Sequence, residues 1–338
     1  MPHDQQEHSE VTNDLFIFEP YDSEKAEEIS GSTTGFWAEA IKRLFKNKGA
    51  VIALIAIFVI TILAIFGPLI NPYSYDEQDL LRSHLPPLVH GLEWAGLDGT
   101  DSHGKDLYQD RNITDAAWLG TDEFGRDLWT RVWRGTQISL FIGVTAALLD
   151  LLIGVIYGGI SAFYGGRVDD MMQRVVEILM GIPNLIIIIL LIMVLKPGLM
   201  SIIIAMVITG WVNMARIVRG QILQLKNQEF VLASRALGAS DGALMWRHLI
   251  PNTMGPIIVT LMFTIPTAIF FEAFLSFIGL GIQPPLASLG SLIEDGYQDM
   301  RYFSYKLIFP AVIISAIMIS FNILGDGLRD ALDPKMRE

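Results

Sequence analysis

Three residues with carboxyl side chains, Asp150, Glu177 and Glu272, stand inside or at the edge of long apolar runs. A charged side chain in a bilayer is costly unless it faces protein or water, so each of them needs a reason. One reason is a transport path through the membrane, and another is a hydrogen bond that holds a helix bundle together. We expect Glu272 to line such a path or to pair across a subunit interface, with the structural hydrogen bond as the alternative. Asp150 and Glu177 are expected to be structural.

Two further side chains, Trp211 and Asn213, lie in another apolar run and could face the same path, although packing within a bundle explains both equally well. Enzymatic chemistry inside the membrane would need a catalytic group of residues within these runs. The runs contain no His or Cys, and no Ser/Lys or paired-Asp arrangement at a suitable spacing. The sequence therefore favours a transport protein over an intramembrane enzyme.

Histidine and aspartate side chains gather between the first two apolar runs, which raises the question of a metal site: His84, His90, Asp98, Asp101, His103 and Asp106. Their spacing matches neither a calcium-binding loop nor the ligand pattern of a zinc site. We therefore expect no metal site here. The stretch is interpreted as a solvated insertion that contacts a binding protein or a neighbouring subunit.

The polar stretch 229–251 is helix-prone and lies between two apolar runs. The spacing of a short amphipathic helix is met by Phe230, Ala233 or Ser234, and Leu237, while Glu229 and Arg235 lie off that face. Such a face could enter the groove of a partner protein. The alternative is an ordinary amphipathic connector that rests on the bilayer surface.

The end of this first helix is expected at Gly238, because glycine tolerates the left-handed conformation that terminates helices. Ser240 or Asp241 then offers an N-cap oxygen to a second helix that runs to Ile250, and Pro251 is expected to close it. The predicted product is a helix, a sharp bend and another helix.

Composition identifies the kind of chain that carries this stretch. Of the 338 residues, 51% are hydrophobic, and several runs approach the ~20 apolar residues that span a bilayer as a helix. The chain has no cysteine, which excludes disulfides and thiolate chemistry. Its formal charge of -12 reflects acidic residues in the first forty positions and after the first apolar run, so net charge says little about partners.

Six membrane spans are expected, at about 50–70, 138–163, 175–195, 200–217, 255–280 and 307–324. A kink is expected in the third span at Pro183. Lys and Arg concentrate before the first span, after the second, fourth and sixth, and within 226–247. The positive-inside rule therefore places both termini and the 229–251 stretch in the cytoplasm.

These spans divide the chain into five parts. We expect a cytoplasmic acidic tail with an amphipathic elbow over 1–48, a first transmembrane helix over 49–70, an extended extracytoplasmic segment over 71–135, a permease core over 136–327 that includes the 229–251 stretch, and a cytoplasmic tail over 328–338. We do not expect the first part to be a cleavable signal peptide, because the first apolar run lies too far in and is too long.

The 229–251 stretch carries a family resemblance. Gly238 is followed thirteen positions later by Pro251, in a loop two spans before the C-terminus, and this resembles the coupling loop of ATP-binding-cassette (ABC) importer permeases. Leu232, Ala233 and Ser234 replace the usual Glu-Ala-Ala, a departure typical of the branch for dipeptides, oligopeptides and nickel. Three other stretches resemble that branch: Leu119 to Gly143 at the second span, Phe274 to Gly281 at the end of the fifth, and Asn322 to Pro334.

The entry and C-terminal motifs resemble those of the C-type subunit of oligopeptide permeases. The departures are Gln137, where an Arg is usual, Ala287 and Leu289, where a Pro and a Trp are usual, and an apparent insertion over 91–115. They concern contacts at the outer face.

The resemblance implies an all-α type I ABC importer permease fold with six transmembrane helices. It also implies several partners: a homologous second permease, two ABC ATPases that carry ATP and Mg, an extracytoplasmic peptide-binding protein, the peptide and the bilayer, with no nucleic acid. The chain itself is expected to bind no cofactor, since it lacks the G-x-x-x-x-G-K-[ST] loop that cradles nucleotide phosphates. The implied coupling-loop residues are Glu229, Phe230, Val231, Ala233, Ser234, Arg235, Leu237, Gly238, Ala239 and Pro251.

The expected function is thus a non-catalytic permease subunit of an ATP-driven oligopeptide importer in the bacterial cell membrane. A dipeptide or nickel-complex permease is the alternative within the family. A secondary transporter or channel would also have six spans and a few intramembrane carboxylates, but it would need neither ATPases nor the Gly238 loop.

Overall fold

The computed structural model describes residues 36–101 and 103–333. The chain divides into two compact units, Met1–Glu39 and Ala40–Glu338. Helix α2, Phe36–Lys46, runs through the boundary between them. The expected acidic tail lies outside the described residues as far as position 35, as do the last five residues of the C-terminal tail.

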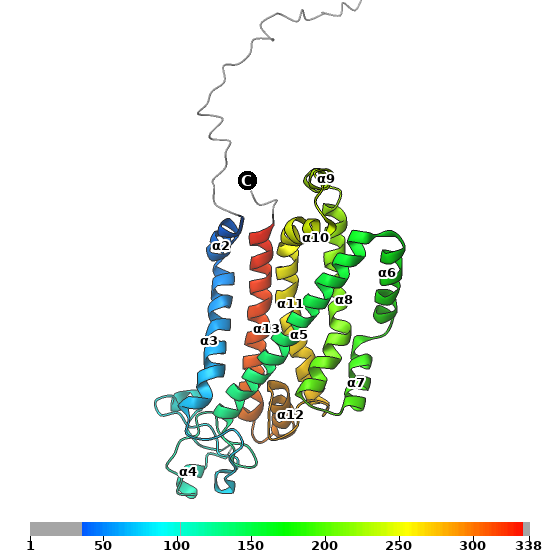
Figure 1. Ribbon diagram of the computed structural model, residues 1–338. Helices are drawn as coiled ribbons and strands as arrows, with labels where there is room; N and C mark the ends of the chain where they lie inside the picture. Colours follow the sequence, from blue (N-terminus) through cyan, green and yellow to red (C-terminus); the bar gives the residue numbers. More distant parts are fainter. Residues whose placement is uncertain (1–35, 102, 334–338) are drawn as a thin grey trace, which may run out of the picture. The chain divides into compact units, whose positions relative to one another are not determined.

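Within the described residues, five helices are long and apolar enough to cross a membrane: α3 (Lys48–Ile70), α5 (Leu128–Tyr164), α8 (Leu199–Leu225), α11 (Ile250–Phe277) together with the helical residues before it from Asp241, and α13 (Tyr305–Leu332). A sixth candidate is the pair α6 (Gly166–Gly181) and α7 (Asn184–Leu195). This arrangement confirms the prediction of an all-α polytopic membrane protein (Figure 1).

The third expected span is a broken helix rather than a kinked one. α6 and α7 are bent by 83° relative to each other. Ile182, between them, has extended backbone angles (φ -104°, ψ 127°), which is the conformation that a following proline imposes by steric clash. Pro183 therefore ends α6 instead of only bending it.

The second expected span begins ten residues earlier than apolarity indicates, at Leu128 rather than 138. Asp127 is the reason, because its side chain accepts a hydrogen bond from the backbone N–H of Thr130 at 2.9 Å and so caps the helix. The first turns of α5 lie against α3, where the Trp129 indole donates to the Gly67 carbonyl at 2.8 Å. The connecting segment between α3 and α5 is therefore 71–127, shorter than the expected 71–135.

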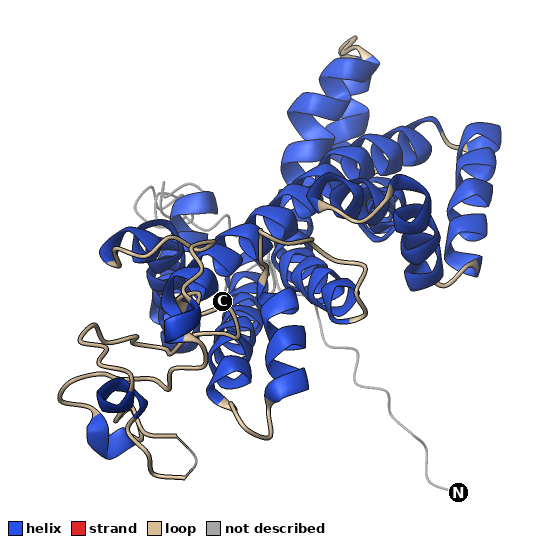
Figure 2. Cartoon of the chain, turned by 90° about the horizontal axis from the view of Figure 1, so that it is seen from below, coloured by secondary structure: helices blue, strands red, loops and turns tan. Residues whose placement is uncertain are grey.

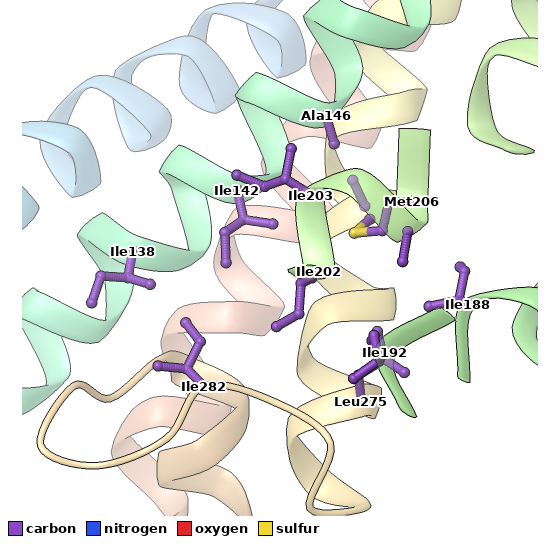
Figure 3. Packing of buried hydrophobic residues seen from close by; sticks show 12 residues of the cluster. Ile138, Ile142, Ala146, Ile188, Ile192, Ile202, Ile203, Met206, Leu275 and Ile282 are labelled. Atoms are coloured by element: carbon purple, nitrogen blue, oxygen red, sulfur yellow. The ribbon is translucent and has the colours of Figure 1, made fainter. Parts of the chain in front are cut away.

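A core of aliphatic side chains joins α5, α7, α8 and α11 (Figure 3). Ile142 of α5, Ile192 of α7, Ile202 of α8 and Leu275 of α11 are all fully buried in it. This packing holds α7 against the bundle beyond the break at Pro183. The 71–127 segment contains short helical turns at Leu80–Arg82, Glu93–Ala95 and Leu107–Asp110 (α4).

The bundle has two ends of different construction, at the top and the bottom of Figure 1, and Figure 2 looks onto the bottom end. One end, here called the α9 end, carries α9 (Glu229–Ala236) and α10 (Asp241–Leu244). The other, here called the α12 end, carries the 71–127 segment and α12 (Leu289–Asp299).

Ion pairs fasten the 71–127 segment to the α12 end. Lys306, only 2% exposed, donates to Glu123 Oε2 at 2.9 Å and also to Asp299. Arg126 Nε donates to Asp122 Oδ2 at 2.6 Å within the segment. The segment is therefore a folded layer on the bundle, not an independent loop.

Candidate functional site

The helix, bend and helix expected over 229–251 are present at the α9 end. α9 covers Glu229–Ala236, and Gly238 has a left-handed backbone (φ +87°) that ends it. Ser240 then caps α10, because its side-chain oxygen accepts from the N–H of Ala243 at 3.3 Å. A residue with a Cβ would be strained at Gly238, although no neighbouring atom lies within 4 Å of the place its Cβ would take.

Pro251 does not close the second helix, which corrects the expectation from sequence. α10 passes through a π-helical turn, Met245–Leu249, directly into α11. Pro251 stands in the first turn of α11, where a missing N–H is tolerated. In proteins, π-helical turns occur mostly as single turns inside longer α-helices. The α9 end is thus rigidly joined to a membrane-spanning helix.

The exposed apolar face of this region differs in part from the expected one. Phe230 is 42% exposed and Leu237 is 90% exposed, as the helical spacing indicated. Val231 is fully buried against the bundle, with Ile222 and Leu249 among its core neighbours, so it is not on the outer face. The helical spacing did not place Leu232 and Trp246 on an exposed apolar face, although they are 49% and 67% exposed. For Trp246, an aromatic side chain in a polar stretch was the available signal.

The remaining expected loop residues surround this face. Glu229, Ala233 and Arg235 are exposed, while Ser234 and Ala239 are half-buried. The Arg235 guanidinium lies 5.7 Å from the centre of the Phe163 ring at the end of α5. Arg235 therefore helps to hold α9 against the bundle.

Charged contacts brace the helices beneath α9. The Arg219 guanidinium of α8 donates two hydrogen bonds to the Asp169 carboxylate of α6, at 2.7 and 2.5 Å. Ser161 of α5 donates to the same carboxylate at 2.5 Å, and Lys226 donates to the Ala162 carbonyl at 2.8 Å. These contacts tie α5, α6 and α8 together near the α9 end.

A cavity of about 530 Å³ opens between α7, α8 and α11. Asn213 lies in its wall, as do Arg216 and several threonines of α11. Trp211 does not line it; this side chain is buried, and its ring packs 4.5 Å from that of Tyr157. Of the two residues on α8 that could face a path, Trp211 and Asn213, only Asn213 lies at the cavity.

Glu272 also lies outside the cavity wall. Its side chain is fully buried and accepts hydrogen bonds from Ser139 of α5 at 2.9 Å and from Ser276 at 2.8 Å. Ser139 in turn accepts from the backbone N–H of Leu289 at the start of α12 at 3.1 Å. Because these contacts satisfy the carboxyl group within the chain, the structural hydrogen bond describes Glu272 better than an open path does.

The other two carboxyl groups also differ from each other. Glu177 is exposed on α6, where it pairs with Arg174 at 2.8 Å. Asp150, which we expected to be structural, lies in the cavity wall and is 4% exposed. No described residue donates a hydrogen bond to its Oδ1.

The histidines between α3 and α5 have separate surroundings. The His84 ring stacks on Phe303 with 4.1 Å between ring centres, and burial lowers the pKa of His84, as does the nearby charge of Lys306. His90 lies 3.9 Å from Glu93 at the surface. The imidazole rings of His84 and His90 therefore have different neighbours.

Comparison with known proteins agrees with this architecture. A family model described as "Binding-protein-dependent transport system inner membrane component" matches residues 151–338, and one described as "N-terminal TM domain of oligopeptide transport permease C" matches residues 35–87. A chain of the MetNI methionine ABC transporter, solved in inward-facing conformations, has a TM-score of 0.50 at 19% identity, covering 60% of this chain and 96% of its own. At that identity the likeness concerns the fold.

Two relatives from Bacillus subtilis (strain 168) are much more similar in sequence. The oligopeptide transport system permease protein OppC is 49% identical over 95% of this chain and 98% of its own. The dipeptide transport system permease protein DppC is 44% identical over 98% of this chain and 96% of its own. The chain therefore belongs to the family of binding-protein-dependent transport system inner membrane components, as an ABC transporter permease of the oligopeptide permease C type.

Proposed function

We propose that this chain is the permease subunit of an ATP-driven oligopeptide importer, in which it forms half of the translocation path and receives force through α9. The observation that carries the proposal is the group of exposed apolar side chains at the α9 end: Phe230, Leu232 and Leu237 on and just after α9, and Trp246 in the π-helical turn that continues into α11. An apolar helix face of this size fits a groove on a partner protein. The 49% identity to an oligopeptide permease supports the peptide cargo.

The partners follow from the same family. A homologous second permease completes the path, two ABC ATPases bind ATP and Mg, and an extracytoplasmic binding protein delivers the peptide. The chain has no phosphate-cradling loop of its own, so hydrolysis belongs to the ATPases. ATP binding draws the α9 segments of the two permeases together, and the contacts beneath α9 pass this movement to α5, α6 and α8.

The orientation of the chain is part of the proposal. Arg235 and Arg247 are exposed at the α9 end, which supports a cytoplasmic position for it and for both termini. The 71–127 segment and α12 then face the extracytoplasmic side and receive the binding protein. A dipeptide importer is the second candidate, favoured by the 44% identity to a dipeptide permease.

A pull-down from the native host tests this assignment. The tagged chain in mild detergent is expected to retain a second permease and two ABC ATPases. Leu237→Asp should lose the ATPases and keep the second permease, because a carboxylate cannot enter an apolar groove without a large desolvation cost.

Trp94→Asp is the matched control, since Trp94 is 84% exposed but lies on the 71–127 segment at the other end of the bundle. It should retain the second permease and both ATPases. Recovery of the wild-type chain alone or as a homo-oligomer would instead favour a secondary transporter or channel.

A further inference from the structure

Asp150 is an unpaired carboxyl group in the wall of the cavity. It lies on α5 within the membrane-spanning part of the helix, is 4% exposed, and has no described hydrogen-bond donor at Oδ1. By contrast, the carboxyl group of Glu272, which is similarly buried, accepts hydrogen bonds from two serine hydroxyls. A buried carboxyl group without partners is costly, so its presence points to a ligand that supplies the missing interaction.

The neighbouring helix leaves room for this group. Asp150 lies directly against Gly210 of α8, and a Cβ at position 210 would come 2.1 Å from its Oδ2. No other residue type could therefore stand at position 210 with Asp150 in its present place. Gly210 also lines the cavity, so the carboxyl group and the space in front of it belong to one site.

The chemistry of the cavity indicates what this ligand is. Among the described residues of its lining, Asp150 is the only one with a carboxyl group and Arg216 the only one with a cationic side chain. The remaining polar lining consists of neutral amides and hydroxyls such as Asn213 and Thr264. Apart from Arg216, the wall around this carboxyl group is neutral and partly apolar, and such a group selects a cation that can donate hydrogen bonds.

Arg216 carries the second charge of the cavity wall, at a distance from Asp150. Arg216 follows Gly210 by six residues on α8, which corresponds to about 9 Å along a helix axis. Its guanidinium makes only a 3.5 Å contact with the Met180 sulfur among the described residues. The cavity is thus acidic at one point and basic at another, an arrangement that suits a zwitterionic chain with an amino group and a carboxylate.

We propose that Asp150 binds the ammonium group of a peptide as the peptide passes through this cavity. The proposal rests on the peptide transport proposed above and adds the group that the permease itself recognises. The ammonium can come from the peptide amino terminus or from a lysine side chain, and both present the same chemistry to Asp150. It donates to the Asp150 carboxyl group, to which no described residue of the chain donates a hydrogen bond.

The test compares two lysine-free peptides of one sequence, one with a free amino terminus and one acetylated. The complete transporter, with its binding protein and ATPases, is reconstituted in liposomes with either the wild-type chain or Asp150→Asn. The measured quantity is the uptake rate of the free peptide divided by that of the acetylated one. Because both transporters use the same binding protein, its own preference cancels when the two ratios are compared.

Asp150→Asn is expected to lower this ratio about tenfold, the size expected for one charge-assisted hydrogen bond. Glu177→Gln is the matched control, since it removes an exposed carboxylate of α6 that does not line the cavity, and its ratio should equal that of the wild type. Should Asp150→Asn not assemble, Asp150→Ser replaces it as a smaller neutral side chain. A third, acetylated peptide with one lysine distinguishes the two sources of the ammonium group.

The outcomes separate this proposal from the one on which it rests. If the wild-type transporter takes up peptide and the ratio is unchanged in the Asp150 variants, the ammonium site is wrong and the importer assignment stands. If the wild-type transporter takes up neither peptide, the importer assignment is wrong and the ammonium site with it.

Discussion

Two carboxyl groups buried among membrane-spanning helices illustrate how different their surroundings can be. Glu272 accepts from Ser139 and Ser276, and through Ser139 it is linked to the start of α12. Asp150 lies against the backbone of Gly210 and has no described donor at Oδ1. The first arrangement stabilises the joint between α5, α11 and α12, whereas the second leaves an interaction open to a ligand.

Glu272→Gln is expected to weaken the joint without changing transport by the folded protein. The amide can accept through only one of its two terminal atoms, so one of the two serine hydroxyls loses its acceptor, at a cost of about 1–3 kcal/mol. The thermal denaturation midpoint of the purified complex should fall, while peptide uptake per folded complex stays at the wild-type value. A loss of uptake by properly folded complex would return Glu272 to the translocation path.

At the scale of the element, helix continuity depends on a few backbone positions. Pro183 separates α6 from α7 because it forces an extended conformation on Ile182. Pro251 causes no such break, since it stands in the first turn of α11 behind a π turn. The α9 end consequently moves with α11, whereas α6 and α7 can change their relative angle at the break.

The 71–127 segment is fastened by Lys306, and Lys306→Met is expected to loosen it. The change keeps the apolar stem but leaves the carboxylates of Glu123 and Asp299 without their shared cation. We expect a loss of about 2 kcal/mol from the local stability of the segment. Hydrogen exchange and limited proteolysis over 71–127 should both be faster. Lys105→Met, which removes an exposed pair with Asp110 on the same segment, should have little effect.

The loss of local stability in Lys306→Met should also depend on pH. Burial alone would raise the pKa of Glu123, but the hydrogen bond and charge of Lys306 outweigh burial and lower this pKa. A lowered carboxyl pKa adds stability above the unfolded value of about 4.3, and this stability is lost as the pH falls below it. The difference between the wild type and Lys306→Met should therefore shrink below about pH 4; a constant difference would contradict the ion pair as its cause.

On the scale of the whole molecule, the bundle separates two kinds of surface. The α9 end presents exposed apolar side chains next to a helix that is continuous with a membrane span, and the α12 end presents a folded layer held by ion pairs. The cavity lies among the helices between these ends. This arrangement suits a subunit that receives force at one end and cargo at the other.

The proposed orientation can be measured directly because the chain has no cysteine. Trp94→Cys and Leu237→Cys place single thiols at exposed positions on opposite ends of the bundle. A membrane-impermeant maleimide should label Trp94→Cys in intact cells. It should label Leu237→Cys only after the membrane is opened and bound ATPases are stripped with urea. Labelling of Leu237→Cys in intact cells would reverse the orientation.

The sequence by itself determined the features that depend on local chemistry. Long apolar runs form helices in a bilayer, because a helix satisfies the hydrogen bonds of its own backbone N–H and C=O groups where no water is present. Gly238 ends α9 because glycine adopts a positive φ without strain, and the ordered motifs around it identified the family.

Only the tertiary structure decided which side chains share an environment. Apolar periodicity could not separate Val231, buried against Ile222, from the exposed Leu232, because both follow from how α9 rests on the bundle. Apolar periodicity also could not show that Ser139, 133 residues away in the chain, donates a hydrogen bond to Glu272. Nor could it show that Asp150 Oδ1 has no described donor. The partners of a buried polar group come from other helices, and packing alone brings them within hydrogen-bonding distance.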